Sequence, residues 1–235
     1  MVDWDNFASD YDSIFLEYPM YVNTIEEMVA QVEEGWDKRI LDVGCGTGNV
    51  TERLHHKFPS ARVLAVDPSE GMREVCVKKF EGVREINVAE GGSLEVPAAY
   101  GEFDSVLSNL ALHHVLPEQR GRCAAELARV LKPGGTLIYA DIFSDVDGSH
   151  EDPAWCRDMI NKTAAWAINC LDHGAYQMML LLLKGLLLDL TGDGEYPTTI
   201  DVWIEALEGA GFSNFEVVHV PPAEIGIRII RARST

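Results

Sequence analysis

The chain has 235 residues, of which 47% are hydrophobic and 24% charged, and its formal net charge is −19 at pH 7. This length allows one domain with an elaboration and a full core, and the composition is that of an ordinary globular protein. Such an acidic surface would repel phosphates, which argues against nucleic acid as a partner. We interpret the negative charge mainly as a source of solubility, and secondarily as mildly favourable to a cationic ligand.

The five cysteines, at 45, 76, 123, 156 and 170, form no CxxC pair and no metal-ligand cluster. We therefore expect reduced thiols, no metal site and a cytoplasmic location. The first residues, Met1-Val-Asp-Trp-Asp, are acidic and polar, unlike a signal peptide. We also expect no stable membrane insertion, because Lys184-Gly185 interrupts the apolar run at 178–188 and a bilayer span needs about 20 apolar residues.

The first elements are a helical arm over 1–35 and a strand with a glycine-rich loop. Aromatic residues recur at helical spacing from Trp4 to Phe15 and predict the arm. The run 39–43 reads as a buried strand, and it enters the loop Gly44-Cys45-Gly46-Thr47-Gly48. A helix is expected over 49–58, with Asn49 as its cap. Glycines here let a ligand approach the backbone closely, because they carry no side chain.

The glycine spacing separates two kinds of nucleotide site. A dinucleotide fingerprint is G-x-G-x-x-G, and its third glycine would fall on Asn49. No Gly-Lys-Ser/Thr run is present after the loop, so the loop is not a P-loop. Because the third glycine is missing, a Rossmann oxidoreductase is only a weaker alternative for the function of this chain.

The middle of the chain predicts alternating strands and helices. Strands are expected over 62–66, 84–89, 103–108 and 136–142, and helices over 69–80 and 117–131. The second strand ends in Asp67, where an acidic residue can accept hydrogen bonds from ribose hydroxyls. The fourth strand should deliver Asn109 beside the first strand, at a topological switch point where ligands bind.

Four segments carry a family resemblance: Asp42-Val-Gly-Cys-Gly-Thr-Gly48, Val66-Asp67-Pro68-Ser69-Glu-Gly-Met72, the stretch from Phe103 to His114, and Leu127 to Gly135. In this order they resemble the class I S-adenosylmethionine (SAM)-dependent methyltransferases. The resemblance implies a Rossmann-like α/β fold: a doubly wound, mostly parallel seven-stranded sheet whose last strand is reversed. A helical arm would precede this sheet, and a helical insertion at 144–198 would come after the fifth strand, within one methyltransferase domain over 1–235.

The resemblance also implies residue roles, with SAM as cofactor and S-adenosylhomocysteine as product. Asp67 would hold the ribose, the glycine loop would admit methionine and ribose, and Tyr11 would close over the methionine. Where relatives often carry Gly-Asp-Ala, this chain has Gly91-Gly92-Ser93, which leaves adenine recognition to backbone groups or Ser93. The cofactor-binding residues expected in all are Tyr11, Asp42, Gly44, Cys45, Gly46, Asp67, Pro68, Met72, Gly92, Ser93, Asn109 and Leu110.

The expected reaction is methyl transfer to a nucleophilic atom of a small apolar or amphipathic molecule. His114 is the candidate for orienting or deprotonating this acceptor, because histidine titrates near neutral pH. Asp141, near the end of the fifth strand, either faces the pocket or caps the segment after that strand. A non-catalytic or partner-dependent SAM-binding protein is a second alternative, and a thiol- or metalloid-directed enzyme using Cys156 or Cys170 is a third.

The remaining segments complete the expected fold. We expect the apolar run at 178–188 to form a buried helix. A helical cap over an apolar pocket, or a homodimer surface, is the next interpretation, and an interfacial membrane contact is the last. A helix over 200–210 and an antiparallel strand pair, 215–220 and 224–231, should end the sheet.

Overall fold

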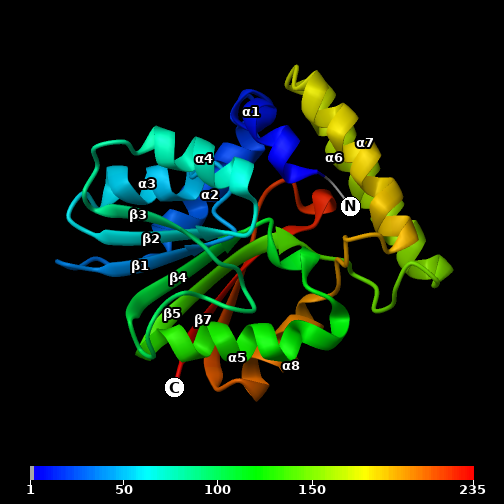
Figure 1. The fold of residues 1–235 in the computed structure, drawn as a ribbon. Helices are drawn as coiled ribbons and strands as arrows, with labels where there is room; N and C mark the ends of the chain where they lie inside the picture. Colours follow the sequence, from blue (N-terminus) through cyan, green and yellow to red (C-terminus); the bar gives the residue numbers. More distant parts are fainter. Residues whose placement is uncertain (1–2) are drawn as a thin grey trace.

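The computed structural model describes residues 3–235 and contains one seven-stranded sheet with helices on both faces (Figure 1). The strand order is β3-β2-β1-β4-β5-β7-β6, and β7 alone runs antiparallel to its neighbours β5 and β6. This confirms the expected doubly wound sheet with a reversed final strand. The strands are β1 Arg39–Val43, β2 Arg62–Asp67, β3 Ile86–Glu90, β4 Phe103–Asn109, β5 Leu131–Ile142, β6 Phe212–His219 and β7 Ile227–Ser234.

Helices fall on two faces and at one edge of this sheet. Figure 1 shows α1 to α4 on one face and α5 with α8 on the other, while α6 and α7 form a hairpin near the amino terminus. The helices are α1 Trp4–Phe15, α2 Pro19–Ala30, α3 Asn49–Lys57, α4 Glu70–Lys79, α5 Arg120–Val130, α6 Pro153–Asp172, α7 Tyr176–Thr191 and α8 Ile200–Gly209. Short 3-10 turns lie at Leu112–His114, Pro117–Gln119 and Ala223–Ile225.

Alternation along the strands builds two apolar layers. In β1, Ile40 belongs to the layer under α2 and α3, whereas Leu41 belongs to the layer under α5 and α8. Val63 and Leu64 of β2 divide in the same way. Successive side chains of a strand point to opposite faces, so a run that is apolar throughout is buried on both sides.

The arm is fixed over the carboxyl edge of the sheet by polar contacts. Asp5 of α1 accepts hydrogen bonds from the Ser69 hydroxyl (2.6 Å) and the Gly71 amide (2.9 Å) at the start of α4. Asp12 accepts a bond from the Thr47 hydroxyl (2.5 Å) in the glycine loop. These bonds hold α1 against the two turns that come after β1 and β2.

The hairpin of α6 and α7 is fixed to the sheet and to α2. Lys162 of α6 is buried, and its ammonium group lies 2.6 Å from the Asp145 carboxylate. Asp145 also pairs with Arg228 of β7. At the other end of α6, the hydroxyl of Tyr18 donates to Asn169 Oδ1 at 2.6 Å.

Several expectations about local structure were wrong. Gly48, with φ of 89°, caps α3, and Asn49 is instead its buried first residue, accepting a bond from Lys79 Nζ at 2.7 Å. The strand expected at 136–142 begins earlier, because β5 already pairs with Phe103 at Leu131. The helix expected at 117–131 begins later, because α5 starts at Arg120. The run at 178–188 is not a buried helix, because α7 leaves Leu187 64% exposed.

Candidate functional site

Two adjoining cavities lie at the carboxyl edge of the sheet, at the switch point between β1 and β4. The smaller, of about 230 Å³, lies between the glycine loop, the end of β2 and the end of β4. The larger, of about 460 Å³, lies under the hairpin of α6 and α7. Trp4, Tyr11 and Leu110 line both, so these three residues form the boundary between the cavities.

Most of the expected cofactor residues line the smaller cavity. Those on its wall are Tyr11, Gly44, Gly46, Asp67, Pro68, Met72, Gly92, Ser93, Asn109 and Leu110, together with His114. Trp4, Ser69, Leu94 and Gln119 also line it and were not singled out from the sequence. The loop, the two strand ends and the arm thus bring the predicted residues together, whereas Asp42 and Cys45 are not on this wall.

Asp67 connects the second strand to the glycine loop. One carboxylate oxygen accepts a bond from the Gly46 amide (2.8 Å) and the other from the Ser69 amide (2.9 Å). Burial raises the pKa of Asp67, although these two amides and Arg73 favour the charged form. The carboxylate therefore reaches the cavity wall in a fixed orientation, and each oxygen keeps a free lone pair for a further donor.

Two buried oxygens near the loop have no hydrogen-bond partner among the described residues: Asp42 Oδ1 and Asn109 Oδ1. The other oxygen of Asp42 accepts a bond from the Thr51 hydroxyl at 2.6 Å. Burial raises the pKa of Asp42 to about 7, and the nearby charge of Asp67 adds to this shift. Of these two residues, only Asn109 lines the cavity. Buried acceptors without partners cost free energy, so the part of the cavity beside Asn109 suits a cationic or hydrogen-bond-donating ligand.

The glycines leave room for such a ligand. At Gly46 (φ of 52°) a Cβ atom would meet only the Met72 sulfur, at 3.9 Å, and would otherwise point into open space. At Gly92 it would meet only Pro68, at 4.0 Å. Gly44 differs, because a Cβ there would lie 2.4 Å from the Ala111 side chain. Side chains at Gly46 and Gly92 would therefore fill the cavity, whereas one at Gly44 would collide with the turn after β4.

Cys45 does not fit the role expected for it. Its amide donates to the Val66 carbonyl at 3.0 Å, and its thiol packs in the core beside Cys76, which with burial raises the pKa of the Cys45 thiol. Cys156 and Cys170 line neither cavity, and Cys170 is fully buried. The geometry therefore gives no support to a direct role for these three thiols.

The larger cavity is walled mainly by apolar side chains. Its lining comes from α1, α6, α7, the turn after β4 and the end of β5, and includes Phe7, Phe15, Ile142, Trp166, Met178, Leu181 and Leu182. Charged or titratable residues also line it, among them Lys184, Asp189, Glu195 and His113. Burial and the neighbouring Glu195 carboxylate raise the pKa of Asp189 to about 7.

His113 and His114 occupy different environments. His113 lies between two carboxylates, with Nδ1 2.6 Å from Asp141 and Nε2 2.9 Å from Glu195. Burial opposes its charge, but the two carboxylates outweigh burial and raise the pKa of His113 well above its usual range. Burial and the charge of His113 lower the pKa of His114, whose Nδ1 lies 2.9 Å from the Gly194 carbonyl.

Sequence reasoning missed Glu195 and left Asp141 undecided. Asp141 is fully buried and accepts bonds from the Tyr139 hydroxyl (2.8 Å) and the His113 amide (3.1 Å). Glu195 lies in the loop after α7, which carried no chemical signal beyond its turn residues. Its proximity to His113 comes from the return of this loop, where the Tyr196 amide donates to the His113 carbonyl at 2.8 Å.

The fold and the cavities together describe an α/β protein with a candidate ligand site at the switch point of its sheet. Several known proteins of similar sequence and fold are methyltransferases. Residues 40–135 match the family model described as a methyltransferase domain. The chain is 42% identical to a malonyl-[acyl-carrier protein] O-methyltransferase of Hahella chejuensis over 120 residues, which are 51% of this chain and 42% of that protein. It is 27% identical to an uncharacterized methyltransferase of Geobacillus kaustophilus over 211 residues, covering 89% of this chain and 81% of that protein.

A solved structure of similar fold extends over the whole chain. It is a methyltransferase from Haloferax volcanii in complex with the Trm112 methyltransferase activator, with a TM-score of 0.71 and 15% identity over 100% of this chain and 98% of that one. The chain therefore has the fold of the class I methyltransferases, and its sequence match to a methyltransferase domain covers residues 40–135. The matches to the first three curated relatives span 42%, 57% and 59% of their lengths, about half of each protein.

Proposed function

We propose that the chain is a SAM-dependent methyltransferase, which binds SAM in the smaller cavity and transfers its methyl group to a small apolar or amphipathic molecule in the larger one. The observation that carries this proposal is the pair of adjoining cavities with a shared boundary at Trp4, Tyr11 and Leu110. A methyl group crossing that boundary would pass directly from one compartment to the other. The family supports SAM as cofactor, and the lining of the larger cavity supports an apolar acceptor.

The chain's own residues would hold SAM along the smaller cavity. Asp67 would accept bonds from the ribose hydroxyls, while Gly44 and Gly46 let ribose and methionine lie against the loop. The unpartnered oxygens of Asp42 and Asn109 would favour the ammonium group of the methionine. Asn109 lines the cavity and would accept a bond from this group, whereas Asp42 lies behind the loop and would act through its charge.

The adenine end would lie at the opposite side of the same cavity. Met72 and Pro68 provide apolar contact there, and both line the wall with Gly92 and Ser93. Because Gly92 has no side chain, recognition of the adenine amino group would fall to backbone groups and the Ser93 hydroxyl.

Positioning accounts for most of the catalysis that this arrangement can provide. Bound SAM would supply a methyl group on a positively charged sulfur, which is a good leaving group. Holding an acceptor in line and excluding water contributes about 7–11 kcal/mol to such reactions. Tyr11 stacks on Phe15 with ring centroids 4.0 Å apart and covers the boundary between the cavities. The aromatic arm would thus keep water from the transfer path.

His114 is the proposed group for orienting or deprotonating the acceptor. It lines the smaller cavity, and its ring lies edge-on to Trp4 with centroids 5.7 Å apart. The Gly194 carbonyl accepts from Nδ1, which leaves Nε2 as the free acceptor of the neutral ring. The proton acceptor would therefore sit beside the boundary that the methyl group crosses.

The partners are inferred from the same surfaces. We propose a small-molecule acceptor without nucleic acid, because the charge of −19 disfavours phosphate-rich partners. A homodimer, or an activator such as the one bound to the Haloferax volcanii methyltransferase, remains an alternative partner. Among residues 3–235, each helix is too short or too polar to cross a bilayer.

Calorimetric titration of the purified chain with SAM, S-adenosylhomocysteine and NAD tests the cofactor assignment. We expect both adenosyl ligands to bind with a stoichiometry of one and NAD not to bind. Acceptors can then be screened with methyl-labelled SAM, beginning with apolar molecules that carry a hydroxyl, amine or thiol group. Binding of NAD in place of SAM would overturn the proposal, and SAM binding without turnover on any acceptor would favour a partner-dependent protein.

A further inference from the structure

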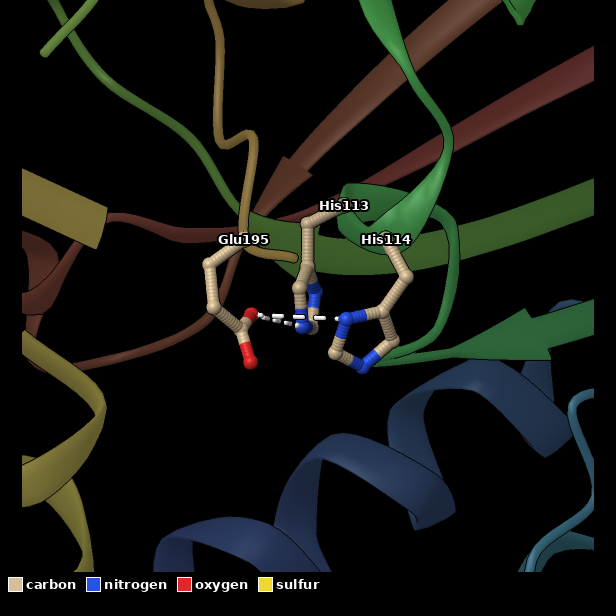
Figure 2. Close-up of side chains that lie close together, drawn as sticks. All are labelled: His113, His114 and Glu195. Atoms are coloured by element: carbon tan, nitrogen blue, oxygen red, sulfur yellow. Dashed lines mark ion pairs between the residues drawn. The ribbon is translucent and has the colours of Figure 1, made fainter. Parts of the chain in front are cut away.

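Three potential metal ligands from two distant segments meet beside the larger cavity (Figure 2). His113 and His114 lie in the 3-10 turn after β4, and Glu195 lies in the loop after α7. In Figure 2 the Glu195 carboxylate lies beside the His113 ring, and dashed lines join one of its oxygens to a ring nitrogen of each histidine. One ligand atom of each residue lies within 4.8 Å of the other two.

The spacing of these atoms suits a small divalent ion. Zinc binds histidine nitrogen and carboxylate oxygen at about 2.0–2.2 Å in tetrahedral geometry, which places neighbouring ligand atoms about 3.4 Å apart. Glu195 Oε2 lies 2.9 Å from His113 Nε2 and 3.5 Å from His114 Nδ1. Movements of these side chains by about half an ångström would therefore bring two of the three distances between ligand atoms to the values of a tetrahedral zinc site.

His113 is already oriented as a metal ligand. Metal-binding histidines commonly donate their second ring N–H to a carboxylate, which fixes the tautomer and turns the other nitrogen toward the metal. Asp141 provides this contact to Nδ1 at 2.6 Å. The Tyr139 hydroxyl and two backbone amides hold Asp141 in turn, so His113 Nε2 is the nitrogen left for an ion.

The local charge also favours a cation. Asp141 and Glu195 approach each other across His113, and Asp189 lies near enough for their charges to raise its pKa. Among residues 3–235, no lysine or arginine forms an ion pair with any of these three carboxylates. Within this part of the chain, the His113 imidazole is the basic group that pairs with Asp141 and with Glu195.

We propose that His113 Nε2, His114 Nδ1 and Glu195 bind a divalent first-row transition-metal ion, with Zn²⁺ as the best match. Two imidazoles and one carboxylate suit zinc, and three protein ligands leave a fourth position open, as in catalytic sites. Mg²⁺ fits less well, because it prefers oxygen ligands in octahedral geometry. Binding would release to solvent the proton shared by His113 Nε2 and Glu195. It would also break the bond from His114 Nδ1 to the Gly194 carbonyl, and the proton of that ring would move from Nδ1 to Nε2.

The open position would face the larger cavity, which His113 and Glu195 line. An acceptor with an oxygen, nitrogen or sulfur donor could bind there. This second inference rests on the proposed function, whereas metal binding itself does not. In the metal-bound form His114 is a ligand and positions the ion, so the ion would replace the imidazole as the group that orients the acceptor.

The test uses the full chain without a histidine tag, stripped with a chelator and titrated calorimetrically with Zn²⁺ and, separately, with Mg²⁺. We expect one tightly bound Zn²⁺ per chain and at least 100-fold weaker Mg²⁺ binding. Substitution of Co²⁺ should give the visible absorption of a tetrahedral nitrogen and oxygen site. Absence of stoichiometric Zn²⁺ binding would overturn the proposal.

Variants assign the ion to these residues. Glu195→Gln and His113→Ala should each weaken Zn²⁺ binding by at least 10–100-fold, the range seen when a metal ligand's supporting partner is removed. His56→Ala is the matched control, because His55-His56 is the other adjacent histidine pair and His56 is exposed on α3. Its Zn²⁺ affinity should equal that of the unmodified chain, and equal affinity in Glu195→Gln as well would overturn the site.

Titration of the same preparations with S-adenosylhomocysteine keeps the two proposals distinguishable. Each variant that still binds this ligand is folded, so a loss of zinc affinity then reports on the ligands alone. Zinc binding without S-adenosylhomocysteine binding would count against the proposed function and leave the metal site standing. The reverse result would count against the metal site only.

Discussion

The Asp67 carboxylate accepts a hydrogen bond from the Gly46 amide at 2.8 Å and so joins the end of β2 to the glycine loop after β1. The ligand cavity opens where these two elements meet, and both residues line it. In the proposed function the carboxylate that shapes the loop would also accept hydrogen bonds from the ribose of SAM.

Asp67→Ala should weaken SAM binding by about 1–3 kcal/mol, because it removes the ribose acceptor and leaves buried donors unpaired. Calorimetric titration with S-adenosylhomocysteine measures this loss. Asp201→Asn on α8 serves as a control for charge, since its side chain is exposed and lines neither cavity. Unchanged affinity in Asp67→Ala would show that the ribose lies elsewhere.

His114→Ala should lower turnover by about 10²–10⁴-fold if His114 orients or deprotonates the acceptor. SAM affinity should change little, because the bond from Nδ1 goes to the protein's own Gly194 carbonyl. Separate determination of kcat and of the dissociation constant for S-adenosylhomocysteine distinguishes the two effects. An unaffected rate would return His114 to a structural role.

Asp42→Asn should stabilise the chain above neutral pH. The carboxyl group has a pKa of about 7 when folded and an ordinary value of 3.8, because burial disfavours its charge. Its contribution to stability is therefore fully present below about pH 4 and is lost as the pH rises through 7. Asparagine keeps an oxygen for the Thr51 hydroxyl and has no charge to bury.

Thermal unfolding of both chains between pH 5 and 8 measures this effect. The advantage of Asp42→Asn should grow with pH and reach about 1–4 kcal/mol at pH 8. SAM binding should weaken in the same variant, since the charge that favours the ammonium group is gone. A stability difference that stays constant with pH would contradict the buried charge.

Gly185 offers a test of the larger cavity. It lies inside α7 and lines the cavity, and a Cβ atom there would meet nothing within 4 Å. Gly185→Ala should stabilise the chain by about 0.5–1 kcal/mol, because glycine is unfavourable inside a helix. Gly185→Phe should fill the cavity, raising the KM for the acceptor while leaving SAM affinity unchanged.

Leu187→Phe is the matched control for this substitution. Leu187 lies two positions further along the same helix and is 64% exposed, outside the cavity lining. Its KM for the acceptor should equal that of the unmodified chain. An equal effect of both substitutions would show that the acceptor does not bind under α7.

Local sequence determined the elements whose signals are short-range. The strand at 39–43, the glycine loop and Asp67 at the end of β2 were predicted because burial, turn geometry and strand periodicity act on neighbouring residues. The doubly wound sheet of seven strands with a reversed final strand was predicted from the family resemblance. Most of the predicted cofactor residues then met at one cavity, because the carboxyl ends of parallel strands share one edge.

Tertiary structure alone decided the rest. Glu195 reaches His113 only because α6 and α7 fold back over the sheet, and no local pattern records such a long-range contact. Cys45 turns into the core because its thiol packs beside Cys76. Asn49 is buried rather than capping α3, and its side-chain oxygen accepts a bond from Lys79. In both cases the tertiary contact outweighs the residue's place in the glycine-loop motif. The exposed side of α7 likewise depends on what packs against it, since an apolar sequence can line a cavity as well as fill a core.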